Sequence, residues 1–289
     1  MENRINDKEL LNLAFSSAES FRMQIDTIIT QLLSQANTKD ILKKSLTLLD
    51  ITTLNDEDYK NSIVKIISQS TYSLCGIEGA VAGICIYSNL LPILREFSLD
   101  KRVRKVVVSG GFPTGQLSLE AKIKDIQFAL ENGADEIDIP INRGLFFENP
   151  TVLGQEIKKI KQQIDLYDKV KLKVILETSQ LRSYENVYKA SMIAMNNGAD
   201  FIKTSTGKTK QGADIYSSAV MIMAIKEFLS NNPDRVVGFK AAGGIRNYEQ
   251  VLQYYSLMLY FFSENYINQD TFRIGCSSLR DDLINNLTK

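Results

Sequence analysis

The sequence predicts a parallel (β/α)₈ barrel that follows an N-terminal helical extension. Eight short runs rich in β-branched residues alternate with longer segments of helical periodicity, from Ser45 almost to the C-terminus. The alternation continues over about 240 residues, a usual length for such a barrel, and no low-complexity linker interrupts it. No Gly-rich dinucleotide fingerprint follows the first predicted strand, which disfavours a doubly wound open sheet, the alternative architecture.

Residues 1–43 are expected to form the helical extension, and residues 44–289 the barrel domain. Apolar residues recur at helical spacing between Leu10 and Leu33, with polar residues between them. We interpret this segment as a pair of helices that caps the barrel. A contact between the subunits of an oligomer is the alternative interpretation.

The predicted strands and helices follow one another along the chain. The strands are expected at 45–52, 80–87, 104–109, 135–141, 172–178, 200–205, 235–241 and 271–276. The helices between them are expected at 55–69, 117–131, 151–166, 183–197, 214–229 and 247–259. Asn55 and Ser183 each precede a helical pattern with an early carboxylate, so both are expected to cap a helix.

The charge balance disfavours nucleic acids and membranes as partners. The 34 basic residues equal the 34 acidic residues in number, so no net charge attracts a polyanion. No stretch reaches the ~20 apolar residues that cross a bilayer, and the N-terminus lacks an apolar signal core. We therefore expect a cytoplasmic protein that acts on a small molecule.

The cysteine and histidine content restricts the chemistry. Cys75, Cys85 and Cys276 lack the spacing of metal ligands, and the chain contains no histidine. We expect the three thiols to be reduced and no metal to be bound. Acid–base chemistry must then rely on lysine, carboxylates, tyrosine, cysteine or water.

Two lysines at the ends of consecutive predicted strands are the strongest sign of catalysis. Lys203 lies in FIKTSTGK (201–208) and Lys240 in VGFKAAGGIR (237–246). Neighbouring strands lie roughly 5 Å apart, and two ammonium groups that close lower at least one of their pKa values. A free lysine amine attacks carbonyl groups and forms a Schiff base. We therefore predict that Lys203 is a nucleophile and that Lys240 activates it.

Strand alternation places further charges inside the barrel. On 135–141 three isoleucines share one face, so Asp138 on the opposite face is expected to point inward. With water it is a candidate proton shuttle. Lys173 is expected to face the same lumen, where it can pair with Asp138, Asp50 or Glu177. Ordinary salt bridges between strands are the alternative, but they would not explain why these charges gather near the strand ends where barrel enzymes place their sites.

Glycines, serines and basic residues follow the last three predicted strands. Glycine lets backbone N–H groups approach an anion closely, and barrels often bind phosphate in the loops at this position. The predicted phosphate ligands are Gly207, Lys208, Gly243, Gly244, Arg246, Gly275, Ser277 and Ser278.

At these residues the sequence resembles the deoxyribose-phosphate aldolase family of class I aldolases. The resemblance runs from about Leu46 to Leu279 and rests on several motifs. These are LDITTLND (49–56), GICIY (83–87), GFPTG (111–115), ENGADEIDIPIN (131–142), LKVILET (172–178), NGADFIKTSTGK (197–208), VGFKAAGGIR (237–246) and RIGCSSL (273–279).

The resemblance implies a role for each candidate. Lys203 would form the Schiff base, Lys240 would lower its pKa and Asp138 would relay protons. The glycines, serines and basic residues above would surround a 5-phosphate, and Asp50, Thr52 and Cys85 would line the sugar side. Ala241 stands where proline or serine is common in the family, and the tail RDDLINNLTK lacks the tyrosine with which some members end.

The resemblance also implies an activity, which is the reversible cleavage of 2-deoxy-D-ribose 5-phosphate to D-glyceraldehyde 3-phosphate and acetaldehyde. No metal or organic cofactor is needed, the setting is cytoplasmic deoxynucleoside breakdown, and members are often homodimers. Two alternatives stay open from the residues: another Schiff-base aldolase with a different sugar phosphate, and a non-catalytic sugar-phosphate sensor.

Overall fold

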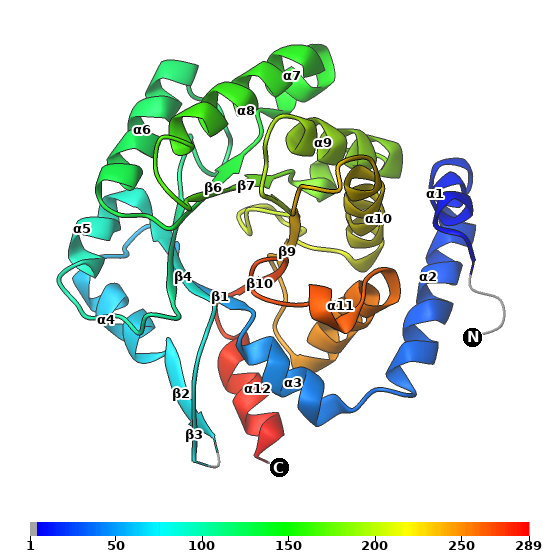
Figure 1. Ribbon diagram of the computed structural model, residues 1–289, viewed down its shortest axis with the longest axis horizontal. Coiled ribbons are helices and arrows are strands. Elements are labelled where there is room, and N and C mark those ends of the chain that lie inside the picture. Colours follow the sequence, from blue (N-terminus) through cyan, green and yellow to red (C-terminus); the bar gives the residue numbers. More distant parts are fainter. Residues whose placement is uncertain (1–4, 75, 289) are drawn as a thin grey trace.

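The computed structural model describes residues 5–74 and 76–288 and confirms the barrel (Figure 1). Its eight parallel strands close in the order β1-β10-β9-β8-β7-β6-β5-β4. The barrel strands are β1 (Leu49–Thr52), β4 (Gly83–Tyr87), β5 (Arg104–Val108), β6 (Glu136–Pro140), β7 (Lys171–Ile175), β8 (Phe201–Lys203), β9 (Gly238–Ala242) and β10 (Phe272–Cys276).

Helices surround the barrel on all sides in the view down its axis (Figure 1). After β1 these are α4 (Lys60–Ser68), α5 (Leu91–Leu94), α6 (Leu119–Glu131), α7 (Arg143–Glu148), α8 (Pro150–Ile164), α9 (Tyr184–Asn196), α10 (Ile215–Asn231), α11 (Tyr248–Phe261) and α12 (Leu279–Leu287). Short 3₁₀ turns occur at η1 (Ser88–Leu90), η2 (Thr178–Gln180) and η3 (Glu264–Tyr266).

The strand pattern explains how the barrel holds both a core and a site. Ile137 and Ile139 on β6 belong to the main apolar core, whereas Asp138 between them is buried among charged groups. Successive side chains of a strand point to opposite faces, so one strand contributes to the helix-packed layer and to the lumen. The lumen of this barrel is therefore packed with charge as well as with apolar groups.

The N-terminal extension forms three helices: α1 (Asp7–Ser16), α2 (Ala18–Leu33) and α3 (Thr38–Leu46). The prediction of a helix pair was thus one helix short. The first two pack against α9, α10 and α11. Every residue of α10 from Ser217 to Ile225 is buried, as expected for a helix covered on its outer side as well. The boundary after residue 43 stays a prediction, and α3 runs across it.

Several local predictions were wrong. Residues 45–46 end α3 rather than open a strand, because the turn into β1 starts only at Thr47. Asn55 does not cap α4, which begins five residues later, and instead donates its backbone N–H to Asp58 at 2.8 Å. The Ser183 cap is confirmed, since its hydroxyl accepts from the backbone N–H of Asn186 at 3.2 Å.

Some elements were not predicted. An antiparallel hairpin, β2 (Thr71–Leu74) and β3 (Ile77–Ala80), projects from the barrel before β4 (Figure 1). Cys75, one of the three predicted free thiols, lies outside the described residues. Cys85 and Cys276 are buried, and neither forms a disulfide with a described residue. No helix in the described part of the chain is both long and apolar enough to span a bilayer.

Candidate active site

The registers of β6, β8 and β9 bring the two predicted lysines together around one carboxylate. Lys203 and Lys240 are direct partners across the β8–β9 pair. Both ammonium groups contact Oδ2 of Asp138, Lys203 at 2.8 Å and Lys240 at 2.9 Å. Because both lie so near one oxygen, the two nitrogens are at most about 6 Å apart. The repulsion expected between them is partly offset by the carboxylate that they share.

Four more charged side chains extend this centre toward the floor of the barrel. Lys173 contacts Asp138 Oδ1 at 3.2 Å and also Glu136. Lys240 contacts Asp50 Oδ2 at 2.5 Å. Arg273 on β10 completes the group. We call the seven linked residues the lumenal cluster: Asp50, Glu136, Asp138, Lys173, Lys203, Lys240 and Arg273.

Arg273 anchors the cluster from below. It donates to Asp50 through Nη1 and to Glu136 Oε1 through Nη2, the latter at 2.6 Å. Its Nε donates to the backbone carbonyl of Gln269, in the loop before β10. All seven side chains are almost completely buried, so each charge depends on these partners for its stability.

Burial and charge act against each other on the ionisation of this cluster. Burial alone would raise the pKa of Asp138, but Lys173, Lys203 and Lys240 together hold that pKa well below its usual range. Arg273 and Lys240 likewise outweigh burial and lower the pKa of Asp50. Burial would lower the pKa of Lys240, yet Asp138 and Asp50 raise it above its usual value. Lys240 is thus a fixed positive charge at neutral pH.

The charges of the cluster do not balance when every member is ionised. Four cations face three carboxylates. Lys173, Lys240 and Arg273 each contact two carboxylates, whereas Lys203 contacts only Asp138 within residues 5–74 and 76–288. A neutral amine at Lys203 would bring the net charge to zero. Among the four cations, Lys203 thus has the fewest carboxylate partners in the described part of the chain.

A polar cavity of about 270 Å³ opens above the two lysines, at the C-terminal ends of the strands. Loops that follow β1, β8, β9 and β10 form its walls. The predicted site residues that line it are Thr52, Lys203, Gly207, Lys208, Lys240, Gly243, Gly244, Arg246, Gly275 and Ser277. Residues far apart in the sequence thus share one cavity.

Glycines set the shape of the cavity wall formed by residues 206–212 and 243–246, which we call the phosphate wall because the sequence predicts a phosphate there. Gly243 and Gly244 have φ values of +87° and +83°, a left-handed region in which other residues are strained. A Cβ on Gly212 would lie 2.2 Å from the carbonyl oxygen of Gly243, so the loops after β8 and β9 touch there through backbone. Gly244 has open space on its side-chain face. This wall can bring backbone N–H groups close to an anion.

Two basic residues border this wall. Lys208 donates from Nζ to the carbonyl of Leu54 at 2.5 Å and so links the loop after β8 to the loop after β1. Arg246 is exposed, and its backbone N–H donates to the Gln250 side chain at 2.8 Å. Both can supply positive charge to a phosphate without leaving the rim.

Four predicted binding residues do not line this cavity. Asp50 and Lys173 lie beneath it as partners of the lumenal cluster. Cys85 is fully buried among apolar residues, and burial raises the pKa of its thiol. Ser278 is exposed and stands one residue before α12. These four remain predictions about substrate contact.

Sequence reasoning gave no role to Arg273, Glu136 or the partners of Glu177. The signal for Arg273 was present, because it alternates with Phe272 and Ile274 on its strand and is the register partner of Lys240. Glu177 has a φ of +56° and accepts from the Thr206 hydroxyl at 2.5 Å and the Thr209 hydroxyl at 3.1 Å. It holds the loop that follows Lys203, a contact that only the folded chain reveals.

Comparisons with known proteins agree with the motifs. A family model described as DeoC/LacD family aldolase matches residues 44–255. The deoxyribose-phosphate aldolases of Homo sapiens and Mus musculus are each 34% identical over 259 residues, which is 84% of this chain and 79% of each relative. The solved structure of a deoxyribose phosphate aldolase from Aeropyrum pernix is 21% identical, with a TM-score of 0.67 over 91% of this chain and 97% of that one.

Proposed function

This chain belongs to the DeoC/LacD family of aldolases, and we propose that it cleaves 2-deoxy-D-ribose 5-phosphate reversibly to D-glyceraldehyde 3-phosphate and acetaldehyde through a Schiff base on Lys203. One observation carries the proposal: Lys203 combines access to the polar cavity with the fewest carboxylate contacts in a cluster that has one cation too many. A lysine in this position can attack the aldehyde of a sugar bound in the cavity once its amine is free.

The first half of the reaction forms an electron sink. The Lys203 nitrogen attacks C1 of the open-chain sugar phosphate, and loss of water from the carbinolamine gives the protonated imine. Asp138 lies 2.8 Å from the Lys203 nitrogen, so with one water it can move the protons that this dehydration requires. Lys240 stays charged and keeps a positive charge close to the Lys203 nitrogen, through the Asp138 oxygen that both contact.

The second half of the reaction cleaves the sugar and releases both products. A base, Asp138 acting through water, takes the proton of the C3 hydroxyl. The C2–C3 bond breaks, its electron pair enters the iminium, and glyceraldehyde 3-phosphate leaves. The enamine then takes a proton at C2, and water hydrolyses the imine to release acetaldehyde and the free lysine.

The phosphate wall supplies binding energy away from the breaking bond. A 5-phosphate held by Gly243, Gly244 and the Lys208 and Arg246 side chains would fix the sugar with its aldehyde toward Lys203. Holding the reacting atoms in this geometry lowers the entropy cost of the attack. A substrate without the phosphate is therefore expected to react much more slowly.

The deciding experiment measures acetaldehyde from deoxyribose 5-phosphate by reduction with alcohol dehydrogenase and NADH. A panel with ribose 5-phosphate and fructose phosphates runs in parallel. Activity confined to deoxyribose 5-phosphate supports the proposal, and preference for another sugar phosphate favours a related aldolase. Binding of deoxyribose 5-phosphate without turnover would support a sensor instead.

Trapping tests the covalent step. Borohydride added with acetaldehyde is expected to attach one ethyl group to the protein, at Lys203, and the variant Lys203→Ala is expected to lose this adduct. Undiminished trapping in the variant would refute the assignment of the nucleophile. The matched variant Lys208→Ala is expected to keep the adduct, because its nitrogen is bound at the rim by Leu54.

The setting of the reaction also belongs to this proposal. We propose that the enzyme serves deoxynucleoside breakdown in the cytoplasm and assembles as a homodimer, as the family resemblance implies. Light scattering after size-exclusion chromatography gives the subunit number directly. A monomer at micromolar concentration would contradict the dimer and leave the aldolase proposal intact.

A further inference from the structure

A second cavity lies at the opposite mouth of the barrel from Lys203. It has a volume of about 580 Å³, within the range of small-molecule sites. Its walls come from residues just before β1, β4, β5 and β10, together with the β2–β3 hairpin and the end of α12. No member of the lumenal cluster lines it.

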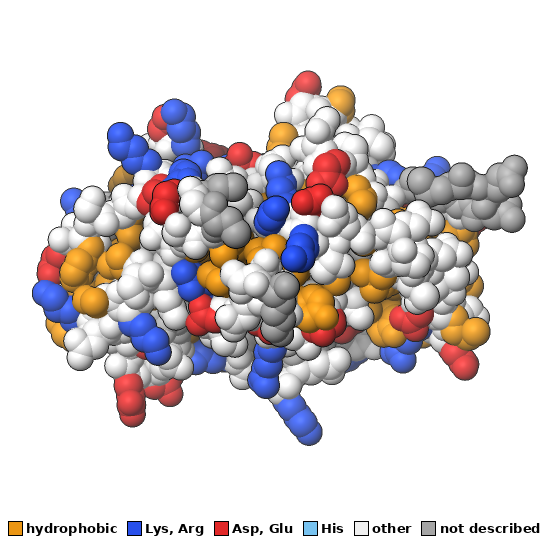
Figure 2. Space-filling model, turned by 90° about the horizontal axis from the view of Figure 1, so that it is seen from below, with side chains coloured by type: hydrophobic (Ala, Val, Ile, Leu, Met, Phe, Trp, Pro, Cys, Tyr) orange, Lys and Arg blue, Asp and Glu red, His pale blue; other side chains and the backbone are white. Residues whose placement is uncertain are grey.

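The interior of this cavity is apolar. Leu46, Leu74, Val81 and Leu287 contribute side chains to its lining. The Tyr72 ring packs so closely over Gly79 that a Cβ there would lie 2.1 Å from it. Figure 2 views the molecule across the barrel axis, from the side on which the hairpin and α12 lie in Figure 1. It shows apolar side chains at the surface near the centre, with basic side chains beside them. The apolar part of a small ligand could therefore pack against these side chains.

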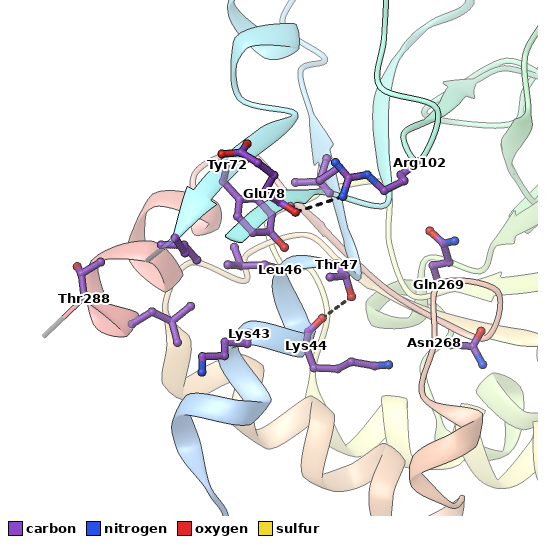
Figure 3. Close-up of a pocket in the computed structure, with 15 residues that line it drawn as sticks. Lys43, Lys44, Leu46, Thr47, Tyr72, Glu78, Arg102, Asn268, Gln269 and Thr288 are labelled. Atoms are coloured by element: carbon purple, nitrogen blue, oxygen red, sulfur yellow. Dashed lines mark hydrogen bonds between the residues drawn. The ribbon is translucent and has the colours of Figure 1, made fainter. Parts of the chain in front are cut away.

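The edge of the cavity is basic. Lys43 and Lys44 lie in the last turn of α3 and line one edge, while Arg102 and Glu78 line the opposite edge (Figure 3). Arg102 is held by Asp100 at 2.7 Å and by the carbonyl of Glu78 at 3.3 Å. Neither lysine forms an ion pair with any residue that the structure describes. Two uncompensated ammonium groups therefore border an apolar hollow.

We propose that this cavity is a second ligand site, separate from the catalytic one, for a small amphipathic anion. The ligand has an apolar body of about two fused rings and one anionic group. The body fills the space between Leu46, Val81 and Leu287. The anion meets either Lys43 or Lys44, whose ammonium groups point in different directions along this edge (Figure 3). Charge complementarity selects an anion over a neutral molecule of the same shape.

The probe is 8-anilinonaphthalene-1-sulfonate, whose fluorescence reports its transfer from water to an apolar site. The neutral analogue N-phenyl-1-naphthylamine has the same body without the sulfonate. We expect one sulfonate probe per chain, and weaker binding of the neutral analogue. The double variant Lys43→Gln/Lys44→Gln should weaken the sulfonate about tenfold, the effect expected of a charge-assisted contact, and change the neutral analogue less than about twofold.

Two controls locate the bound probe. Leu287→Trp fills the cavity from a half-buried position at the end of α12, and it should weaken both probes more than about tenfold. Lys39→Gln, on the same helix but outside the lining, should change neither. Thermal unfolding of each variant verifies that it is folded.

The result can overturn the proposal in two ways. Equal binding of the two probes, or no loss in the lysine double variant, would remove the anion site. Displacement of the sulfonate by deoxyribose 5-phosphate, or its loss in Lys203→Met, would place the probe in the catalytic cavity instead. Because the probe is assayed without turnover, failure of the aldolase proposal would leave this test unaffected.

Discussion

The two mouths of the barrel are built from the same eight strands but have opposite chemistry. At the C-terminal mouth, a polar cavity of about 270 Å³ lies above seven buried charges. At the N-terminal mouth, a cavity of about 580 Å³ has apolar walls and charges only at its edge. The loops that follow the strands are rich in glycine at the first mouth, whereas a hairpin and two helix ends cover the second.

The difference shows where charge affects reactivity. In the lumenal cluster, each charged group is buried away from water. The contacts among the seven residues therefore determine which of these groups are protonated. At the N-terminal mouth, the pair Asp100–Arg102 remains exposed to solvent, which screens it. Substitutions that change one charge should therefore have large effects at one mouth and small effects at the other.

Removal of the nucleophile gives the largest expected difference between the mouths. Lys203→Met should lower kcat/KM for deoxyribose 5-phosphate by roughly 10⁴-fold or more, as for other enzymes that lose their nucleophile. Lys43→Met at the opposite mouth should leave kcat/KM within about twofold. Steady-state acetaldehyde release measures both. Comparable losses in the two variants would show that the fold, rather than the amine, had been damaged.

Removal of the second lysine tests the charge balance. Lys240→Met leaves three cations and three carboxylates in the cluster, so a protonated Lys203 becomes balanced and the reactive amine scarcer. We expect kcat/KM to fall by about 10²–10³-fold at pH 7, and the acidic limb of the pH–rate profile to move to higher pH. Arg102→Met should leave the profile in place. A Lys240→Met profile that is lowered but not displaced would contradict this role.

Acid should destabilise the protein through the lumenal cluster. The pKa values of Asp50 and Asp138 are lower in the folded state than in the unfolded chain, so their stabilisation is present above about pH 5. It is lost as the pH falls toward the lowered values. Denaturant unfolding should show a decrease of a few kcal/mol in the free energy of unfolding between pH 5 and pH 3.

The matched carboxylate for this experiment is Asp100. Arg102 lowers the pKa of Asp100 to about 2, but the pair is exposed to solvent. The variant Asp100→Asn should keep the same dependence of unfolding on pH, and 1 M salt should not abolish that dependence in either protein. If the pH dependence of unfolding disappeared in Asp100→Asn, the acid sensitivity would come from the exposed Asp100–Arg102 pair instead of the lumenal cluster.

The smallest expected effect concerns the loop after Lys203. Glu177→Gln weakens the acceptor for the Thr206 and Thr209 hydroxyls, which shape the phosphate wall. We expect KM to rise about tenfold with kcat changed less than about threefold, since positioning of the phosphate is lost and the amine is not. Glu78→Gln at the other mouth should alter neither constant. A fall in kcat at constant KM would instead place Glu177 in the chemical step.

The sequence was sufficient to predict the barrel and the lysine centre. Strands such as 135–141 alternate so regularly that the inward face of Asp138 follows from period two alone. Lys203 and Lys240 stand at equivalent points of consecutive strands, and their pairing needed only parallel register. These features depend on local pattern, which a single sequence carries.

Other features depend on contacts that no local pattern encodes. Asn55 resembles a helix cap, but a hydrogen-bonded turn with Asp58 delays α4 by five residues. The β2–β3 hairpin was missed because Gly76 and Gly79 weaken its strand pattern. The contacts of Arg273 with Asp50 and Glu136 join residues 223 and 137 positions apart, and only closure of the barrel brings them together.

The Arg273 anchor affects how this protein can be re-engineered. Its Nε is held by the backbone carbonyl of Gln269, an acceptor that persists whichever side chain occupies that position. Point substitutions at 269 should therefore be tolerated, whereas insertions or deletions between 269 and 273 would pull the guanidinium away from Asp50. In chimaeras with other barrels, the length of this short connection, more than its composition, would decide whether a grafted catalytic face still works.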